Sequence, residues 1–307
     1  MTTNAEFSPR QRPNLAAKQP NLGGFDAKTS LPSGGPTSAA PKLRREATIA
    51  IAGMGLIGGS FHKALTRAGH DVVGFDKGDV VRVEDADLII VALAPKTAVD
   101  WICLHAPEFR DGAIVVDTCG VKGAVIASLR ERGVFGGRFT FVGGHPMAGK
   151  AVGGYANSDA DLFKGASMLL TPDPGTPDAV LDTLRAVFAD AGFARTVVTD
   201  PAHHDEMIAF TSQLCHVISS AYLRDELASL HDGFSAGSYR DMTRVGAPDP
   251  VLWAELFTLN RDALVPVLDR FIGRLSRFRE AIAADDVASL EAQIAEGRAA
   301  SGAADNR

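Results

Sequence analysis

The sequence contains few cysteines, no long apolar run and no cluster of like charges. Its three cysteines, Cys103, Cys119 and Cys215, are odd in number and widely spaced, which excludes a disulfide framework and favours a reducing, cytoplasmic setting. No apolar stretch approaches the roughly 20 residues needed to span a bilayer, so we expect no membrane partner. The net charge of −6, without a basic block, argues against nucleic acid as a partner.

The composition indicates a globular protein with two domains. The chain has 307 residues and is 46% hydrophobic, which is enough for two buried cores. Residues 1–46 are rich in proline, glycine and small polar residues and are predicted to form a disordered tail. Residues 47–199 alternate between strand and helix patterns, whereas residues 200–300 show only helical periodicity and precede a short tail at 301–307. The long apolar helices of the second domain suggest packing across a homodimer.

A glycine-rich turn organises the first domain. It lies between an apolar strand pattern and a helical pattern, the context in which G-x-G-x-x-G predicts dinucleotide binding. Gly53 permits a tight turn, Gly55 lets a pyrophosphate approach the backbone, and Gly58 lets the helix pack against the strand. The N–H groups at the start of the following helix, predicted from Phe61, would bind the pyrophosphate, and Leu56 and Ile57 of the turn are candidate cofactor contacts. The alternative is a glycine turn without a ligand. The predicted fold is therefore an α/β dinucleotide-binding domain of Rossmann type, followed by an all-α domain.

An acidic residue ends the second predicted strand. Asp76 follows the glycines at about the distance at which a carboxylate accepts hydrogen bonds from the adenosine ribose. A carboxylate there favours NAD and makes NADP less suitable, because it would repel a 2′-phosphate, although the neighbouring Lys77 weakens this argument. Asp76 could instead be a turn residue before Lys77 and Gly78.

The rest of the first domain departs from an ordinary dinucleotide fold in one interval. Residues 77–87 are too few to hold both a helix and a strand, so we expect a trimmed sheet with a more open adenine pocket. Ala94 and Pro95 form part of a predicted loop at the carboxyl end of a strand, where ligands bind. Strands are predicted at 48–52, 71–75, 88–93, 113–117, 139–142, 166–170 and 195–198.

A histidine follows the predicted strand at 139–142. His145 lies between glycine and proline, on a loop at the same sheet edge as the glycine turn. A neutral imidazole there could accept a proton near pH 7. A purely structural loop histidine is the alternative.

Two further groups lie in the helical domain. His216 is surrounded by apolar residues near the middle of a helix, where a histidine is often simply part of the core. Asp241 and Arg244 are spaced to pair on one helix face, and Trp253 follows them. On its own, such a pair is a surface ion pair that contributes little.

The segment from His203 to Glu206 is rich in potential metal ligands. Adjacent helical residues point in different directions, and no distant cysteine or histidine set completes a site. We therefore predict no metal and interpret this segment as a polar helix start.

Taken together, these motifs resemble the prephenate dehydrogenase family, which includes arogenate dehydrogenases, over residues 48–298. The residues that carry the resemblance are Gly53–Gly59, Asp117 through Lys122, Gly144-His145-Pro146-Met147-Ala148-Gly149, His216, Arg240-Asp241-Met242-Thr243-Arg244 and Trp253.

The resemblance implies an NAD-dependent oxidative decarboxylation of prephenate in tyrosine synthesis, or of arogenate. It implies that His145 draws the proton from the ring C4 hydroxyl while hydride leaves C4 for the nicotinamide. It further implies that His216 and Arg244 bind substrate carboxylate and carbonyl groups, and it includes Asp241, Trp253 and Lys122 in the motifs around the substrate. Family members are homodimers through the helical domain.

The sequence departs from the family pattern at several positions. Gly120 replaces a serine that contacts the catalytic histidine, Ala151 replaces a frequent glutamate, and Gln213 and Cys215 alter the motif that ends at His216. These departures, with the shortened segment after Asp76, leave open a second hypothesis, a paralogue that binds its ligands without turnover.

Overall fold

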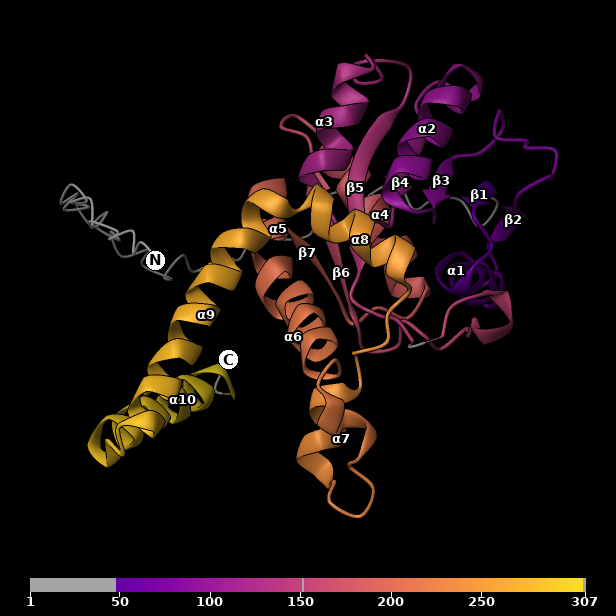
Figure 1. Cartoon of the computed structure of the whole chain (residues 1–307). Coiled ribbons are helices and arrows are strands. Elements are labelled where there is room, and N and C mark those ends of the chain that lie inside the picture. The colour runs from indigo at the N-terminus through magenta and orange to yellow at the C-terminus, as the bar shows by residue number, and fades with distance from the viewer. Residues whose placement is uncertain (1–47, 151, 306–307) are drawn as a thin grey trace, which may run out of the picture. The chain divides into compact units, whose positions relative to one another are not determined.

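The structure, a computed structural model, describes residues 48–150 and 152–305, in which a seven-stranded sheet is followed by a series of helices (Figure 1). The predicted tail at 1–46 and Ala151 lie outside the described residues. The predicted fold class, an α/β domain followed by a helical domain, is confirmed. The strands are β1 Thr48–Ala52, β2 Asp71–Phe75, β3 Leu88–Val91, β4 Ile114–Asp117, β5 Thr140–Pro146, β6 Ser167–Pro172 and β7 Arg195–Val198.

The sheet has the order β2-β1-β3-β4-β5-β6-β7, and its strands pair in parallel except for β5 with β6. Strand β2 forms one edge, and the described residues between Phe75 and Leu88 contain neither helix nor strand. A dinucleotide-binding sheet ordinarily carries a further strand beyond this one. The trimmed sheet expected from the short interval is therefore confirmed.

Helices cover both faces of the sheet because alternate residues of the central strands point in opposite directions. Ile49 and Ile51 of β1 pack toward α1 and α4, whereas Ala50 and Ala52 pack toward α2 and α3. The helices of this domain are α1 Leu56–Arg67, α2 Pro95–His105, α3 Gly123–Glu131 and α4 Asp178–Asp190, with short 3-10 turns at Ala106–Glu108 and Tyr155–Asn157.

Two local predictions are wrong at the sheet edge where the strands end. The segment predicted as a loop at 94–97 contains the start of α2, because Pro95 occupies the first helical position, where its missing N–H costs nothing. His145 lies within β5 rather than on a loop, since antiparallel pairing with β6 extends the strand to Pro146 and places His145 opposite Leu169.

The helical domain begins after β7. Its elements are α5 Pro201–Ile208, a π-helical turn Ala209–Gln213, α6 Leu214–Tyr222, a 3-10 turn Glu226–Ser229, α7 Gly237–Thr243, α8 Pro250–Leu259, α9 Arg261–Ala283 and α10 Val287–Asp305. Asp200 caps α5 by accepting a hydrogen bond from the His203 N–H at 2.9 Å. The helical stretch predicted to run to about residue 230 is interrupted by the π turn and ends at Tyr222. None of the helices in the described ranges is long and apolar enough to cross a bilayer.

A buried ion pair fixes the turn between β4 and α3 against β5. The Lys122 ammonium contacts the Asp117 carboxylate and donates to the Gly144 carbonyl at 2.6 Å, and Lys122 is fully buried. Asp117 also accepts hydrogen bonds from the N–H groups of Cys119 and Gly144, each at 3.0 Å. Because every charged atom has a partner, the pair holds the residue before His145 at a fixed place.

We predict that Lys122→Met lowers the free energy of unfolding by about 3–5 kcal/mol, because it leaves the Asp117 carboxylate buried without its cation. Urea unfolding measures this change. The exposed Lys164 provides the control, since Lys164→Met should shift stability by no more than about 0.5 kcal/mol. Equal stability of the two variants would contradict a structural role for the pair.

Candidate active site

The glycine turn has the geometry that a pyrophosphate requires. Gly53 has a φ of +90°, and an added Cβ would meet the Ala92 carbonyl oxygen at 2.5 Å. A Cβ at Gly58 would lie 1.9 Å from the Gly53 oxygen, so only glycine lets α1 start so close to β1. A Cβ at Gly55 meets nothing within 4 Å, and Gly55 provides no side-chain cap for α1. The space beside Gly55 is therefore open, at the start of a helix whose first N–H groups, where Leu56 and Ile57 lie, have no partner within the helix.

The other predicted cofactor residues lie at the same edge of the sheet. Asp76 follows β2 and is exposed, and one of its carboxylate oxygens accepts the Lys77 N–H at 2.8 Å. Asp76 is thus a turn residue, and its second carboxylate oxygen is free of protein partners among the described residues at the end of β2. Ala94 caps α2, whose Lys96 N–H donates to Glu255 of α8 at 2.7 Å. This contact joins the helical domain to the sheet edge at which the nicotinamide half of the cofactor would lie.

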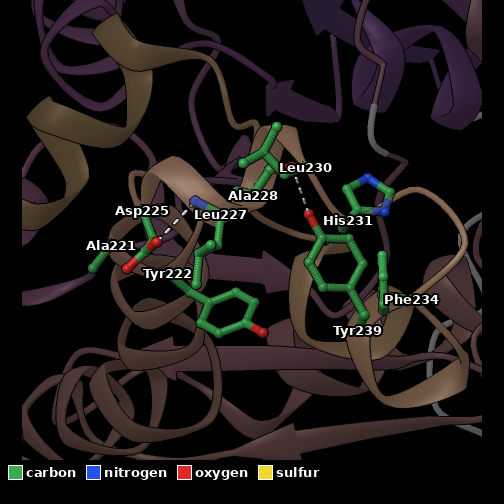
Figure 2. Close-up of a pocket in the computed structure, with 9 residues that line it drawn as sticks. All are labelled: Ala221, Tyr222, Asp225, Leu227, Ala228, Leu230, His231, Phe234 and Tyr239. Carbon is green, nitrogen blue, oxygen red and sulfur yellow. Dashed lines mark hydrogen bonds between the residues drawn. The ribbon is translucent and has the colours of Figure 1, made fainter.

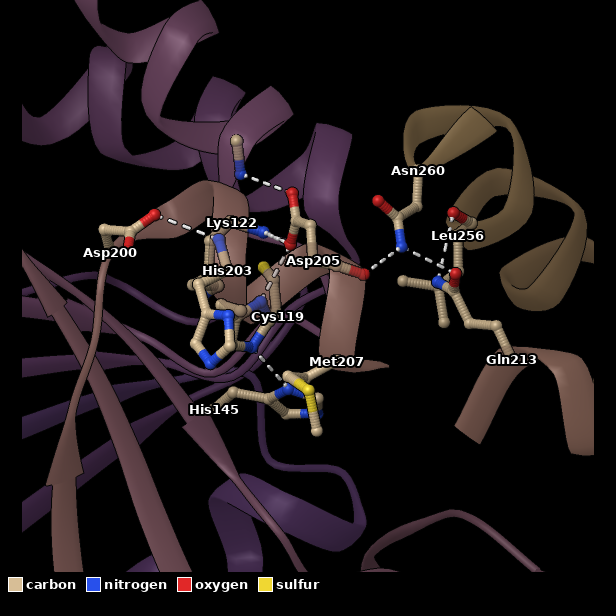
Figure 3. A network of polar contacts seen from close by, with 12 residues as sticks. Cys119, Lys122, His145, Asp200, His203, Asp205, Met207, Gln213, Leu256 and Asn260 are labelled. Atoms are coloured by element: carbon tan, nitrogen blue, oxygen red, sulfur yellow. Dashed lines mark hydrogen bonds and ion pairs between the residues drawn. The ribbon is translucent and has the colours of Figure 1, made fainter. Parts of the chain in front are cut away.

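His145 lies at one end of a polar network between the two domains (Figure 3). Its Nδ1 lies 3.0 Å from Nε2 of His204, and Nδ1 of His204 lies 2.8 Å from the Asp205 carboxylate. Asp205 in turn accepts the N–H groups of Lys122 and Gly123, each at 2.8 Å. The start of α5 is therefore held against the start of α3, and His204 of α5 reaches His145 of β5.

The surroundings of His145 favour its neutral form. Burial holds the pKa of His145 well below its ordinary value, and the nearby His204 and Lys122 lower it further. Burial also lowers the pKa of His204, against the opposing effect of its hydrogen bond to Asp205. A neutral imidazole at the carboxyl end of β5 can accept a proton, which is the chemistry expected of a general base.

His204 and Asp205 were missed by the sequence analysis, which interpreted them as a polar helix start. His204 is 1% exposed and Asp205 is 7% exposed, so both belong to the interior. The local signal was the Asp200-Pro201 cap, which fixes where the helix starts. Their burial depends on packing against α3, which the sequence pattern does not reveal. Among the described residues, no group of three or more His, Cys, Asp or Glu side chains is placed to hold a metal ion.

Position 120 faces the other nitrogen of the His145 ring. A Cβ added at Gly120 would lie 3.7 Å from Nε2 of His145 and 3.4 Å from Leu256 of α8. A side chain at this position would therefore reach the imidazole, as the resemblance to the family implied for serine. In this chain Nε2 has no side-chain partner from position 120.

The predicted substrate residues of the helical domain form a second group. The rings of His216 and Trp253 lie 3.6 Å apart between centroids, and His216 Nδ1 donates to the Val245 carbonyl at 2.9 Å. This bond holds the segment after α7 beside α6. Burial lowers the pKa of His216, and the charge of Arg244 lowers it further against the effect of the Val245 bond.

Helix α8 connects the two groups of side chains. Trp253 and Leu256 are three residues apart on α8 and so share a face, with Leu256 beside position 120. The Gln213 amide donates to the Leu256 carbonyl at 3.5 Å and accepts from Asn260 at 2.7 Å. Gln213, which departs from the family motif, therefore supports α8 from within the core.

Two predictions about side-chain contacts differ from the structure. Asp241 and Arg244 are both exposed, and among the described residues they form no ion pair with each other. The ammonium of Lys122 is enclosed by Asp117 and the Gly144 carbonyl, which favours a structural role over the predicted contact with substrate.

A separate cavity of about 590 Å³ lies in the helical domain, away from His145 (Figure 2). Its lining comes from the end of α6, the following 3-10 turn, the loop after that turn and the start of α7, and it includes Tyr222, Leu227, Phe234 and Tyr239. None of the predicted cofactor or substrate residues lines it. We therefore do not place the reaction there.

Two family models match the chain. The model for the nucleotide-binding domain of prephenate dehydrogenase covers residues 41–198, and the model for its dimerization domain covers residues 200–296. The cyclohexadienyl dehydrogenase of Zymomonas mobilis is 33% identical over 266 residues, which are 78% of this chain and 89% of that protein.

Solved structures agree with these matches. The Synechocystis arogenate dehydrogenase is 25% identical with a TM-score of 0.71, covering 83% of this chain and 99% of that one. A prephenate dehydrogenase from A. aeolicus, in complex with hydroxyphenyl propionate and NAD+, is 25% identical with a TM-score of 0.70. The match covers 82% of this chain and 96% of that one. With matches over both its sheet and helical domains, the chain belongs to the prephenate dehydrogenase family.

Proposed function

We propose that this protein oxidises and decarboxylates prephenate to 4-hydroxyphenylpyruvate with NAD, as a step of tyrosine synthesis. The observation that carries the proposal is the place of the His145 imidazole at the carboxyl end of β5, on the same sheet edge as the glycine turn, where burial lowers its pKa. Arogenate is the second candidate substrate, since the Synechocystis structure is an arogenate dehydrogenase and the Zymomonas relative is a cyclohexadienyl dehydrogenase.

The cofactor site would be built mainly from backbone. Gly53, Gly55 and Gly58 shape the turn, and the N–H groups at Leu56 and Ile57 would hold the pyrophosphate. Asp76 would accept the ribose hydroxyls, while Ala94 and Pro95 would border the nicotinamide half. When bound, NAD supplies the hydride acceptor.

The chain's own residues would handle the proton and the carboxylates. We propose that His145 accepts the C4 hydroxyl proton at Nε2, since Nδ1 is engaged with His204. Arg244 would hold a substrate carboxylate with its planar fork, and His216 would do so with Nε2, since Nδ1 donates to Val245. Trp253 would pack beside them, and Asp241 of α7, which forms no ion pair with Arg244 among the described residues, would be a further substrate contact.

We further propose that the protein is a cytoplasmic homodimer through its helical domain. Support comes from the match to a dimerization domain and from apolar side chains exposed along α9, among them Ile272 at 55% and Ile282 at 62%. Sedimentation analysis tests this, and a monomer at all concentrations would contradict it. The three free cysteines suit a reducing compartment.

The decisive experiment crosses two substrates with two cofactors. Purified protein is given prephenate or arogenate, each with NAD or NADP, and the growth of reduced-cofactor absorbance is measured. We expect turnover with NAD, and the ratio of kcat/KM values identifies the preferred substrate. Binding of both ligands by calorimetry without any turnover would instead support the silent paralogue.

The acid limb of the pH dependence of kcat/KM should lie at low pH. His145 must be neutral to act as a base, and burial lowers its pKa, so kcat/KM should fall only as the pH drops below the ordinary imidazole value of about 6.5. The test measures kcat/KM from acid to neutral pH at constant ionic strength. A limb at or above that value would show that another group, or an unshifted histidine, controls the rate.

Arg244→Ala should act mainly on substrate binding. Removal of a charged hydrogen bond to a carboxylate costs about 1.5–3 kcal/mol, so KM should rise roughly ten- to a hundredfold with NAD binding unchanged. The exposed Arg185 on α4, which pairs with Asp182 at 2.7 Å, provides a matched control. If Arg185→Ala and Arg244→Ala gave the same KM, Arg244 would not bind the substrate.

A further inference from the structure

We propose that His204 and Asp205 are positioning residues that keep the proton of the neutral His145 ring on Nδ1, so that Nε2 is free to act as the base. This inference rests on the proposed dehydrogenase function. It starts from three side chains in series, Asp205, His204 and His145, linked at 2.8 and 3.0 Å.

Asp205 determines which ring nitrogen of His204 carries a hydrogen. Its Oδ1 accepts the Lys122 N–H and faces Nδ1 of His204, while its Oδ2 accepts the Gly123 N–H. An ionised carboxylate can only accept hydrogen bonds, and both of these backbone groups can only donate. Nδ1 of His204 must therefore carry a hydrogen.

The location of the hydrogen on His145 follows from that of the hydrogen on His204. In a neutral imidazole one nitrogen donates and the other accepts, so Nε2 of His204 is an acceptor. The contact of 3.0 Å to His145 then requires a hydrogen on Nδ1 of His145. Because burial keeps His145 neutral, its Nε2 is unprotonated and presents its lone pair toward position 120.

The same series can accommodate the proton taken from the substrate. When Nε2 of His145 accepts the hydroxyl proton, the ring becomes a cation whose Nδ1–H still donates to His204. Transfer of that hydrogen to Nε2 of His204 would move the positive charge next to the Asp205 carboxylate and would leave His145 neutral. The charged groups that face this series are Asp117, Lys122 and Asp205.

Position 120 makes this support necessary. Glycine there offers no hydroxyl to Nε2, so among the described residues a side chain orients the ring by hydrogen bonding only through Nδ1. His204 is 1% exposed, so water does not compete for that contact. The chain thus positions its base from the side opposite to the substrate.

The first test is spectroscopic and needs neither substrate nor turnover. Long-range nitrogen–proton correlation spectra of the full-length protein, labelled at its histidines, report which ring nitrogen carries hydrogen. We expect hydrogen on Nδ1 of both His145 and His204, with the resonances assigned by His145→Gln and His204→Gln. Hydrogen on Nε2 of His145 would overturn the proposal, whatever the activity of the protein.

The second test is kinetic and uses the neighbouring histidine as its control. His204→Phe should lower kcat at least tenfold with KM within about twofold, and His204→Gln should recover part of the loss, because its amide oxygen can accept from Nδ1 of His145. His203→Phe, at an exposed position on the same helix, should leave kcat unchanged.

The outcomes separate this proposal from the proposed function. A folded His204→Phe enzyme with wild-type kcat would refute the positioning role while leaving the dehydrogenase assignment intact. Absence of turnover in the wild-type protein would refute the function, and the spectra would still decide where the protons lie. If His204→Phe did not fold, the spectra of the wild-type protein would decide alone.

Discussion

Asp205 makes the contacts on which the packing of the two domains and the geometry of the site depend. Its carboxylate oxygens accept two backbone N–H groups at the start of α3 and face His204, while its backbone carbonyl accepts from Asn260 at the start of α9. A buried carboxylate is tolerated only when its acceptor capacity is used. Its full set of partners therefore fixes α5 against α3, and with it the histidine that meets His145.

Helix α8 provides the second connection between the domains, by different chemistry. Glu255 accepts the N–H of Lys96 at the start of α2, Leu256 lies beside position 120, and Trp253 packs against His216. Three residues within about one turn of α8 thus contact the start of α2, lie beside position 120 and pack on His216. A change in the tilt of α8 would alter all three contacts together.

The sequence alone predicted what depends on local pattern. The glycine turn, the trimmed sheet after Asp76 and the start of the helical domain at Asp200 each follow from neighbouring residues. His145 was found but was placed on a loop, because the antiparallel partner β6 lies more than twenty residues away. His204 and Asp205 were interpreted as part of a polar helix start. Their burial comes from packing against α3, which the local sequence pattern does not reveal. The roles of the substrate and cofactor residues remain predictions.

Glycine at position 120 changes how a histidine base can be held. A hydroxyl at that position would compete for the Nε2 lone pair, which in the proposed reaction accepts the substrate proton. Without it, orientation has to come from Nδ1, where a neutral partner alone would allow either tautomer. A histidine whose own proton is fixed by a carboxylate removes that freedom, because only one arrangement of hydrogens satisfies every contact. The arrangement of Asp205, His204 and His145 is thus sufficient to place the hydrogen of a neutral His145 ring on Nδ1 without a side chain at position 120.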